Sequence, residues 1–337
     1  MNPKVAIVIL NYNTKDFLKD FLPSVCVTNY ENKEIVVIDN HSKDDSVAFL
    51  KSNFKNIKVI ELQENYGFTG GYNHGLKLVE ADYFVLLNSD VKVDKDWLQP
   101  MVNLAMSDKK IGAIQPKILD YNYPGKFEYA GACGGFMDKF GFPYCRGRIF
   151  ETIEEDQGQY DDIKQIFWAT GAAIFIKAEL YHELGGLDED FFAHMEEIDL
   201  CWRLQNKGYK IMVCPESKVY HVGGGTLKKT NPQKTYYNFR NGLILLIKNL
   251  PKNKLLPIII TRLILDHVAA YRWLFQGKTA DFFAVAKAHR HFVFRLKYWY
   301  KKRNTSKENA YNSDLVLHKS IAMEYYLRKK KFFSFLK

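Results

Sequence analysis

The stretch Tyr83-Phe84-Val85-Leu86-Leu87-Asn88-Ser89-Asp90 contains the clearest strand in this sequence. Its first five residues are apolar without a helical gap, which is typical of a strand buried on both faces of a sheet. Three small polar residues follow, and in open α/β sheets ligands bind beyond the carboxyl ends of the strands. Asn88 and Asp90 therefore suit a divalent cation held against a diphosphate, although the same residue types are also common in turns.

Three other apolar stretches predict further strands, with helical segments between them: Val5–Leu10, Glu34–Ile38 and Ile57–Leu62. Strands that alternate with helices indicate βαβ units and a parallel sheet. The first two of these strands end in Asn11 and Asp39. Because the carboxyl ends of parallel strands meet at one edge, we expect Asn11, Asp39 and Asp90 to line an edge that can hold a nucleotide. For Asp39 alone, an ordinary turn residue at a strand end is an equal alternative.

One glycine-rich turn is a candidate for ligand contact, and a second turn interrupts a predicted strand. Asn65 to Gly75 is rich in glycine and leads into a helix, so its backbone can approach a ligand closely. Its spacing is not that of a dinucleotide-binding fingerprint, and it lacks the lysine of a P-loop. Thr170-Gly171 breaks the apolar stretch Gln165–Ile176 with a tight turn. We expect Trp168, beside that turn, to lie in the core rather than to stack on a sugar.

Acidic residues gather between Gly185 and Leu204, where six carboxylates occur. A helix is predicted from Glu196, so Glu196 and Glu197 fall in its first turn, where the helix dipole stabilises negative charge. Ordinary capping explains such residues, but six carboxylates exceed what capping needs, and a carboxylate at a helix start is well placed as a general base. Farther on, His221 precedes three glycines, a setting in which we expect a metal ligand rather than a core residue.

The charge of the chain is divided unevenly. The 337 residues carry a net charge of +10, but residues 226–337 hold 24 Lys and Arg against 5 Asp and Glu, while residues 1–225 hold 24 against 33. A basic region of this kind favours an anionic surface, either phospholipid headgroups or nucleic acid. The five cysteines are odd in number and lack metal-ligand spacing, which is typical of a reducing, cytosolic setting. The N-terminus leads directly into a strand, so we expect no signal peptide.

Together these residues resemble the inverting glycosyltransferases of family 2, which have the GT-A fold. The resemblance covers residues 4–250 and is strongest to the rhamnosyltransferase-like branch that builds bacterial cell-surface polysaccharide. It implies an α/β fold with a Rossmann-like, mostly parallel sheet flanked by helices. The catalytic domain would span residues 1–250, and a basic helical region would span residues 251–337. The resemblance rests on the order and spacing of these motifs: Val8 to Asn13, Val37 to Asn40 with Ser42, Asn65 to Phe68 with Gly71 and Asn73, Leu87 to Asp90, Thr170-Gly171, Gly185 to Asp188 with Phe191-Phe192, Glu196 to Arg203, and His221.

The resemblance also implies a role for each motif. Asp90 stands at the family's Asp-x-Asp motif and would bind Mg²⁺ or Mn²⁺, with His221 as a second ligand. The family's base is the second carboxylate of a Glu-Asp pair, here Glu196-Glu197, so we favour Glu197 over Glu196 and Asp199. Arg240 belongs to a Tyr-x-x-Arg-Asn pattern that would meet phosphate. The residues implied at the donor are Asn11, Asp39, Asn65, Gly71, Asn73, Asn88, Thr170, Gly171 and Arg240.

The activity implied is an inverting, metal-dependent hexosyl transfer. The donor would be a nucleotide-sugar, dTDP-rhamnose or a UDP-hexose, and the acceptor a hydroxyl of a growing, lipid-linked surface glycan. Such a transfer needs one base and one cation. Two other functions remain open. A sugar nucleotidyltransferase would need a glycine-rich basic loop where this chain has Asn11-Tyr12-Asn13-Thr14, and a non-catalytic membrane-bound scaffold would not need Asp90, Glu197 and His221.

The basic region from residue 251 mixes aromatic and basic residues in predicted helices. Amphipathic helices of this kind commonly lie in a membrane interface, so we expect peripheral attachment to anionic lipid on the inner, cytoplasmic face of the bacterial plasma membrane. A solvated helical bundle is the alternative, and a homo-oligomer is left open. No nucleic-acid-binding motif accompanies the charge, which argues against that partner. The longest apolar run, Leu255–Leu265, is too short to span a bilayer and contains Arg262.

Overall fold

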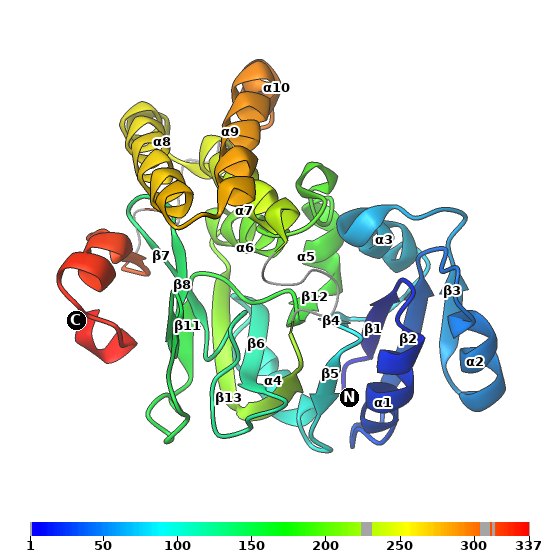
Figure 1. Cartoon of the computed structure of the whole chain (residues 1–337). Coiled ribbons are helices and arrows are strands. Elements are labelled where there is room, and N and C mark those ends of the chain that lie inside the picture. The colour runs from blue at the N-terminus through cyan, green and yellow to red at the C-terminus, as the bar shows by residue number, and fades with distance from the viewer. Residues whose placement is uncertain (1, 224–230, 304–310, 312–313, 337) are drawn as a thin grey trace.

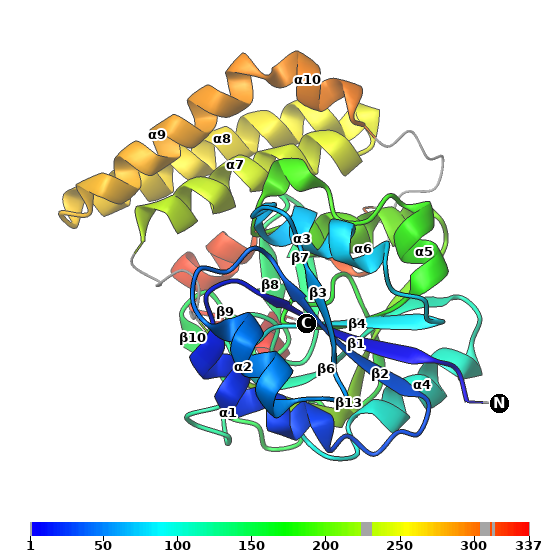
Figure 2. The ribbon, with the colours of Figure 1, turned by 90° about the vertical axis from the view of Figure 1, so that its right-hand side faces the viewer.

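The computed structural model describes residues 2–223, 231–303, 311 and 314–336. Figures 1 and 2 show three parts: a central sheet of nine strands between helices, a second sheet of five strands, and a group of long helices stacked beyond the central sheet. Of the glycine run after His221, Gly224 and Gly225 lie outside the described residues. The expected α/β architecture is confirmed, and a second sheet is formed by residues 135–153 together with a strand from the C-terminal region.

The central sheet is built on the strand predicted first, β4 (Tyr83–Leu87). It pairs in parallel with β1 (Val5–Asn11), which pairs with β2 (Lys33–Asp39) and through it with β3 (Lys58–Glu61). The remaining strands are β5 (Val91–Val93), β6 (Ile111–Asp120), β11 (Lys164–Ile166), β12 (Ala173–Lys177) and β13 (Lys210–His221). β12 joins β4 to β6 in antiparallel fashion, and β13 runs parallel to β6. The half that carries the predicted strands is therefore parallel, and the other half is mixed.

Each face of the central sheet has its own core, because alternate residues of β4 point to opposite faces. Val85 and Leu87 pack with α1 (Lys15–Cys26) and α4 (Leu98–Ser107). Phe84 and Leu86 pack on the face that carries other helices. These are α3 (Gly67–Leu76), α5 (Ala178–Glu183) and α6 (Glu196–Asn206), while α2 (Ser46–Asn53) lies between β2 and β3 along the chain. Burial on both faces explains the unbroken apolar run of β4 in the sequence.

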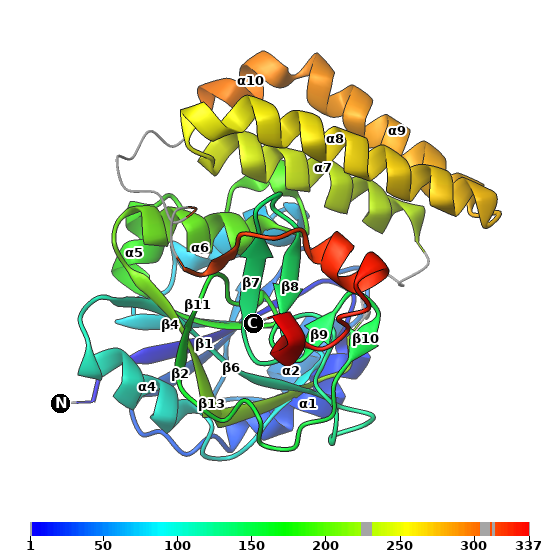
Figure 3. The same cartoon turned by 90° about the vertical axis from the view of Figure 1, so that its left-hand side faces the viewer.

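The second sheet lies beside the central sheet (Figure 1). Its strands are β7 (Gly135–Asp138), β8 (Pro143–Cys145), β9 (Arg148–Ile149), β10 (Thr152–Ile153) and β14 (Val316–Leu317). β14 comes from the C-terminal region and pairs in parallel with β7. Beyond it, the ring of Phe333 lies 5.2 Å from that of Phe136. The end of the basic region therefore folds back onto the second sheet instead of extending as a tail (Figure 3). Trp168 also packs here: it is 4% exposed, and its Nε1 donates to the Phe136 carbonyl, which confirms the core position.

The helices α7 (Pro232–Asn249), α8 (Lys252–Phe275) and α9 (Thr279–Phe294) pack against one another, and α10 (Leu296–Lys301) continues from α9 (Figures 2 and 3). We call α7 to α10 the helical unit. The boundary expected at residue 250 falls between α7 and α8, but α7 packs on both α8 and α9 and so belongs to this unit, while it also contacts α6. None of the described helices combines the length and the apolar character needed to cross a membrane.

Candidate active site

Asn11 and Asp39 meet at the carboxyl ends of β1 and β2, where the register pairs them directly. Asn11 Nδ2 donates to Asp39 Oδ1 at 2.7 Å and to Ser42 Oγ at 3.0 Å, and both Asn11 and Asp39 are buried. The Thr14 hydroxyl donates to Asn11 Oδ1 at 2.6 Å and lies 3.2 Å from Ser89 Oγ. The edge predicted to hold a nucleotide is thus a preformed polar network that reaches from β1 to the turn after β4.

The glycine-rich segment is fixed above this edge by Asn40. Its Nδ2 donates to Asn65 Oδ1 and to the Gly67 carbonyl, both at 2.9 Å, so Asn65 lies beside the nucleotide edge. Close packing explains the glycine at position 71, because a Cβ there would stand 2.7 Å from Leu10 Cδ1. Asn73 accepts from the Tyr181 hydroxyl and exchanges hydrogen bonds with the backbone of residue 187. Gly71 and Asn73 therefore serve the fold, and their contact with a donor stays a prediction.

Asp90 and His221 come together although 131 residues separate them, because β13 pairs with β5 directly after Asp90. Asp90 Oδ1 lies 3.2 Å from His221 Nε2, and Glu128 Oε2 lies 3.5 Å from His221 Nδ1; all three side chains are buried. Burial acts to lower the pKa of the His221 imidazole, but its contacts and charge interactions with Asp90 and Glu128 outweigh burial and raise that pKa to about 10.

The chemistry of this cluster fits a divalent cation. A carboxylate oxygen and an imidazole nitrogen are ligands for Mg²⁺ or Mn²⁺. Glu128 lies beside Nδ1, the ring nitrogen of His221 that faces away from Asp90. Metal-binding histidines commonly have a carboxylate at the ring nitrogen that does not bind the metal. Within the described residues, no group of three or more His, Cys, Asp or Glu side chains is arranged to hold a metal by itself. Asp90 and His221 therefore suit a cation whose other ligands come from a substrate.

The acidic pair stands at the start of α6. Burial raises the pKa of the Glu197 carboxyl to about 7, and burial together with the charge of Glu197 raises the pKa of Glu196 well above its usual range. Among the residues that the structure describes, one carboxyl oxygen of each has no hydrogen-bond partner. Glu196 is only 4% exposed, whereas Glu197 is partly exposed. The exposed part of Glu197 does not include its Oε2, which is buried. A carboxyl with a pKa near neutrality is suited to accept a proton at physiological pH.

The turn Thr170-Gly171 lies against this pair. A Cβ built at Gly171 would stand 3.8 Å from Glu197 Cβ and 3.9 Å from Phe68 Cζ, so the glycine backs directly onto the candidate base. Thr170 is buried, and its backbone N–H donates to Gln115 Oε1 at 2.9 Å. The Asn88 backbone N–H donates to the carbonyl of Ala172 at 3.0 Å. This turn therefore connects the strand end at Asn88 with the acidic pair.

Asp199 has a different environment from its two neighbours. Its Oδ2 accepts from Arg203 Nε at 2.7 Å and from Lys248 Nζ at 2.9 Å, and its Oδ1 accepts from Asn249 Nδ2 at 2.8 Å. Burial acts to raise the pKa of Asp199, but the charges of Lys248 and Arg203 outweigh burial and hold that pKa far below its usual range. A carboxylate stabilised in this way is a poor proton acceptor, so Glu197 is the best placed of the three candidates.

Arg240 is also committed within the protein. Its Nη2 donates to the carbonyls of Asp190 and Phe191 at 2.8 and 2.9 Å, and its Nε donates to Asn241 Oδ1 at 2.8 Å. Its guanidinium lies over the Tyr237 ring, 5.2 Å from the centroid. Arg240 and Tyr237 thus hold the segment that precedes the acidic pair, and a contact between Arg240 and phosphate stays a prediction.

Comparison with known proteins finds a family match for the N-terminal part of the chain. Residues 6–154 match the family model described as glycosyl transferase family 2. The chain carries a family 2 glycosyltransferase domain. The matched residues include the nucleotide edge, Asp90 and Glu128. The acidic pair and His221 lie beyond the match, so their place in the transferase site rests on the geometry above.

Curated relatives of the transferase act in glycan synthesis. The N-acetylglucosaminyl-diphospho-decaprenol L-rhamnosyltransferase of Mycobacterium tuberculosis is 21% identical over 235 residues, which is 66% of this chain and 76% of that protein. The poly-beta-1,6-N-acetyl-D-glucosamine synthase of Staphylococcus aureus is 29% identical over 219 residues, which is 63% of this chain and 48% of that protein. The resemblance to family 2 transferases of cell-surface polysaccharide synthesis is confirmed.

A solved structure gives the fold. The mannosyltransferase PcManGT from Pyrobaculum calidifontis, in complex with GDP-Man and Mn²⁺, superimposes with a TM-score of 0.53 and 13% identity, covering 90% of this chain and 84% of that one. The transferase accordingly has the GT-A fold that the sequence led us to expect.

Two charged residues near the transferase site were not predicted from the sequence. Glu128 backs His221, and Arg148 is 8% exposed with its Nε donating to the Tyr129 carbonyl at 2.8 Å. Within the described part of the chain, no carboxylate forms an ion pair with Arg148. Burial acts to lower the pKa of its guanidinium, but interactions with Cys145, Tyr129 and Glu128 outweigh burial and raise that pKa. Neither Glu128 nor Arg148 belongs to a recognisable motif. The only signal in the sequence is that each is a charged residue within a stretch rich in aromatic residues and glycines.

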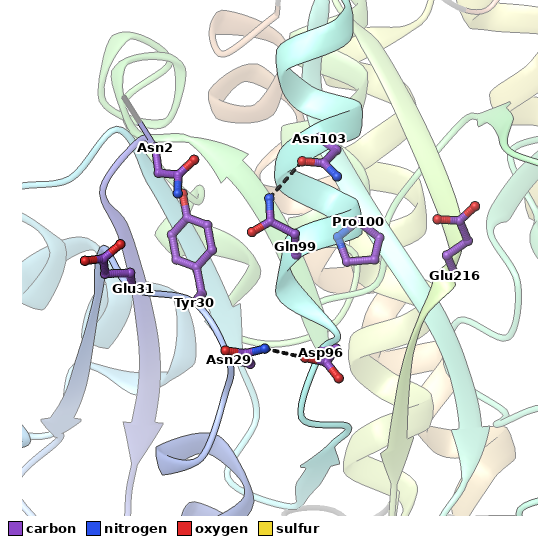
Figure 4. Close-up of a pocket in the computed structure, with 9 residues that line it drawn as sticks. All are labelled: Asn2, Asn29, Tyr30, Glu31, Asp96, Gln99, Pro100, Asn103 and Glu216. Carbon is purple, nitrogen blue, oxygen red and sulfur yellow. Dashed lines mark hydrogen bonds between the residues drawn. The ribbon is translucent and has the colours of Figure 1, made fainter.

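A pocket of about 430 Å³ lies elsewhere, near the amino ends of the strands (Figure 4). Two hydrogen bonds join residues that line it, from Asn29 to Asp96 and from Gln99 to Asn103. None of the predicted site residues lines this pocket, which is formed by Asn2, Asn29, Tyr30, Glu31, Asp96, Gln99, Pro100, Asn103 and Glu216. It therefore has no part in the candidate site at the carboxyl ends.

Proposed function

We propose that the transferase moves a sugar from a nucleotide-sugar donor to a hydroxyl group of a growing surface glycan, with inversion at the anomeric carbon. The observation that carries the proposal is the pairing of one available base, Glu197, with an Asp90–His221 cluster suited to a cation. The donor is dTDP-rhamnose or a UDP-hexose, which the L-rhamnosyltransferase and N-acetylglucosamine synthase relatives support.

The reaction follows from the roles of these groups. Glu197 accepts the proton of the acceptor hydroxyl, the freed oxygen bonds to the anomeric carbon, and the nucleoside diphosphate leaves from the opposite face. When Mg²⁺ or Mn²⁺ is bound by Asp90 and His221, it neutralises the diphosphate as charge develops there. Asn11, Asp39 and Asn65 orient the nucleoside. Because the leaving group needs no proton, no second acid is required, in contrast to a glycoside hydrolase.

A donor panel tests this function. Thermal shift with a series of nucleotide-sugars, in the presence of Mn²⁺, should single out one donor, since a ligand at about 100 times its dissociation constant adds about 2.7 kcal/mol to stability. Hydrolysis of that donor without acceptor then separates an enzyme from a non-catalytic scaffold. Binding without any hydrolysis or transfer would favour the scaffold, and release of pyrophosphate from a nucleoside triphosphate and a sugar phosphate would favour a nucleotidyltransferase.

The acceptor we propose is linked to lipid, and the helical unit would hold the transferase at an anionic membrane. Six large apolar residues are exposed along α8 at helical spacing: Leu256, Ile260, Ile264, Val268, Tyr271 and Phe275. Phe275 is 87% exposed, as is typical of residues that enter an interface. Residues 226–337 carry a net charge of +19, which attracts anionic headgroups and opposes the stacking of two such faces. The name of the M. tuberculosis relative specifies a decaprenol-linked acceptor for that protein.

Flotation with vesicles tests the membrane contact. We expect binding to anionic vesicles, weaker binding to neutral ones, and partial release by salt. The pair Leu256→Ser and Phe275→Ser should weaken flotation, whereas Tyr123→Ser, which removes a 68% exposed ring from the catalytic part, should not. Equal binding to both vesicle types would contradict the electrostatic part of the proposal. Self-association that the same α8 variants abolish would instead make α8 an interface between copies.

A further inference from the structure

The segment from Asp188 to Met195, which leads into the acidic pair, has an unusual backbone. Phe192, His194 and Met195 have φ values of 65°, 68° and 74°, in the left-handed region that side chains other than glycine rarely adopt. Such residues persist only where the surrounding structure holds them. Met195 directly precedes Glu196, so its conformation sets the direction in which α6 begins and the two carboxylates project.

Asn241, on α7, holds this backbone. Its Nδ2 donates to the carbonyls of Phe191, Ala193 and His194 at 3.0, 2.8 and 2.7 Å, and the Asn241 side chain is fully buried. Arg240 adds its bonds to the carbonyls at the start of the same segment, and the Asn241 Oδ1 accepts from Arg240 Nε. Two neighbouring residues of α7 thus satisfy the carbonyls of the strained turn.

Lysines of the helical unit fix the same segment from another side. Lys248 on α7 pairs with Asp188 at 2.6 Å and with Asp199 at 2.9 Å. Lys302, just after α10, pairs with Asp188 at 2.6 Å and also with Asp190. The segment before the acidic pair and the first turns of α6 are therefore tied to both ends of the helical unit, which lies outside the residues that match the family model.

We propose that the helical unit positions the reactive carboxylates of the transferase, with Asn241 and Lys302 as positioning residues that hold the Asp188–Met195 segment in its strained form. The inference rests on the proposed function only in taking Glu196 and Glu197 as the reacting pair. It predicts that loosening the segment lowers kcat and leaves donor binding intact, because the nucleotide edge at Asn11 and Asp39 is built from other elements.

The sharpest variant is Asn241→Asp. It keeps the size of the side chain and the oxygen that accepts from Arg240, but it removes all three bonds to the carbonyls. We expect faster hydrogen exchange across residues 189–199, and a kcat reduced about 100-fold at a nearly unchanged KM for the donor, as for a misplacement of about 1 Å. Leu245→Ala, a buried change on the same helix, controls for general loss of stability: it should lower Tm while exchange in this segment and kcat of the folded enzyme stay as in wild type.

Lys302→Met is the second variant, which avoids the core because this side chain is 32% exposed. Lys301→Met is its control, since it removes the same charge from the neighbouring exposed position. We expect Lys302→Met to lower kcat about 10-fold and to speed exchange in residues 189–199, and Lys301→Met to change neither. Equal behaviour of the two lysine variants, or faster exchange in Asn241→Asp with an unchanged kcat, would overturn the proposal. Hydrogen exchange is measured without turnover. A protein that transfers no sugar at all would therefore contradict the proposed function, while the exchange results would still test whether Asn241 and Lys302 hold the Asp188–Met195 segment.

Discussion

The nucleotide edge and the segment around the acidic pair are held by contacts of very different range. At the edge, Asn11 bonds to Asp39 and Ser42, which lie 28 and 31 residues away in the chain. At the acidic pair, Asn241 reaches the segment across 47 to 50 residues, and Lys302 reaches Asp188 across 114. The first site is therefore held within two consecutive βα units, whereas the second is held by side chains from the helical unit. The following experiments test that difference.

The largest effect is expected at Glu197. Glu197→Gln keeps the shape of the side chain and removes proton acceptance, so kcat should fall by a factor of about 100 to 10,000 while the donor binds nearly as in wild type. Steady-state kinetics with calorimetric donor binding measures both. A nearly normal Glu197→Gln together with an inactive Glu196→Gln would move the role to Glu196.

The next largest effect is expected on the free energy of unfolding, which should fall more for a change near the acidic pair than for a change at the nucleotide edge. Asp199→Asn breaks a buried ion pair with Lys248 and Arg203 and should cost about 3 to 5 kcal/mol of unfolding free energy at neutral pH. Asp39 Oδ1 accepts from Asn11 Nδ2 and Asp39 Oδ2 accepts from the Ser42 backbone N–H, so Asp39→Asn removes the charge and one of these two acceptors and should cost about 1 to 3 kcal/mol. Urea unfolding of the two variants gives the comparison. Equal costs would show that both networks contribute alike.

The pH dependence of stability should distinguish Glu197 from Asp199. The pKa of Glu197 is raised in the folded protein, from 4.5 to about 7, so its contribution to stability is present at low pH and is lost as pH rises through 7. Glu197→Gln has no proton to lose and should be the more stable protein at about pH 8, by at most about 3 kcal/mol. Asp199 has a lowered pKa, so its contribution is present above its unfolded pKa of 3.8 and is lost as pH falls below that value. Unfolding curves across this pH range test both signs, and a Glu197→Gln variant less stable than wild type at high pH would contradict the burial of this carboxyl.

The smallest effect is expected behind the proposed cation site. Glu128→Gln keeps the size of the side chain that backs His221 and removes its charge, which should weaken Mn²⁺-dependent binding of a nucleoside diphosphate by about 10- to 100-fold. Asp90→Ala and His221→Ala should weaken it further. Calorimetry with and without Mn²⁺ measures the difference. Wild-type activity that a chelator leaves unchanged would show that the metal proposal is wrong.

The sequence by itself determined the parallel half of the sheet and the polar residues at its edge. β1, β2 and β4 are short apolar runs that end in small polar residues. A strand buried on both faces needs apolar residues at successive positions, so it is recognisable from the sequence. The adjacency of Asn11 and Asp39 follows from the register of parallel strands, which local sequence specifies. The uneven charge of the chain was likewise evident from composition alone.

Only the tertiary structure decided how the carboxylates differ. Glu196, Glu197 and Asp199 are alike in the sequence, but Lys248 and Arg203 stabilise the charge of Asp199 while burial without a countercharge raises the pKa of Glu197. The same holds for Arg240, whose guanidinium meets backbone carbonyls. A pKa depends on which charges surround a group and how much water reaches it, and those neighbours come from chain segments that no local pattern connects.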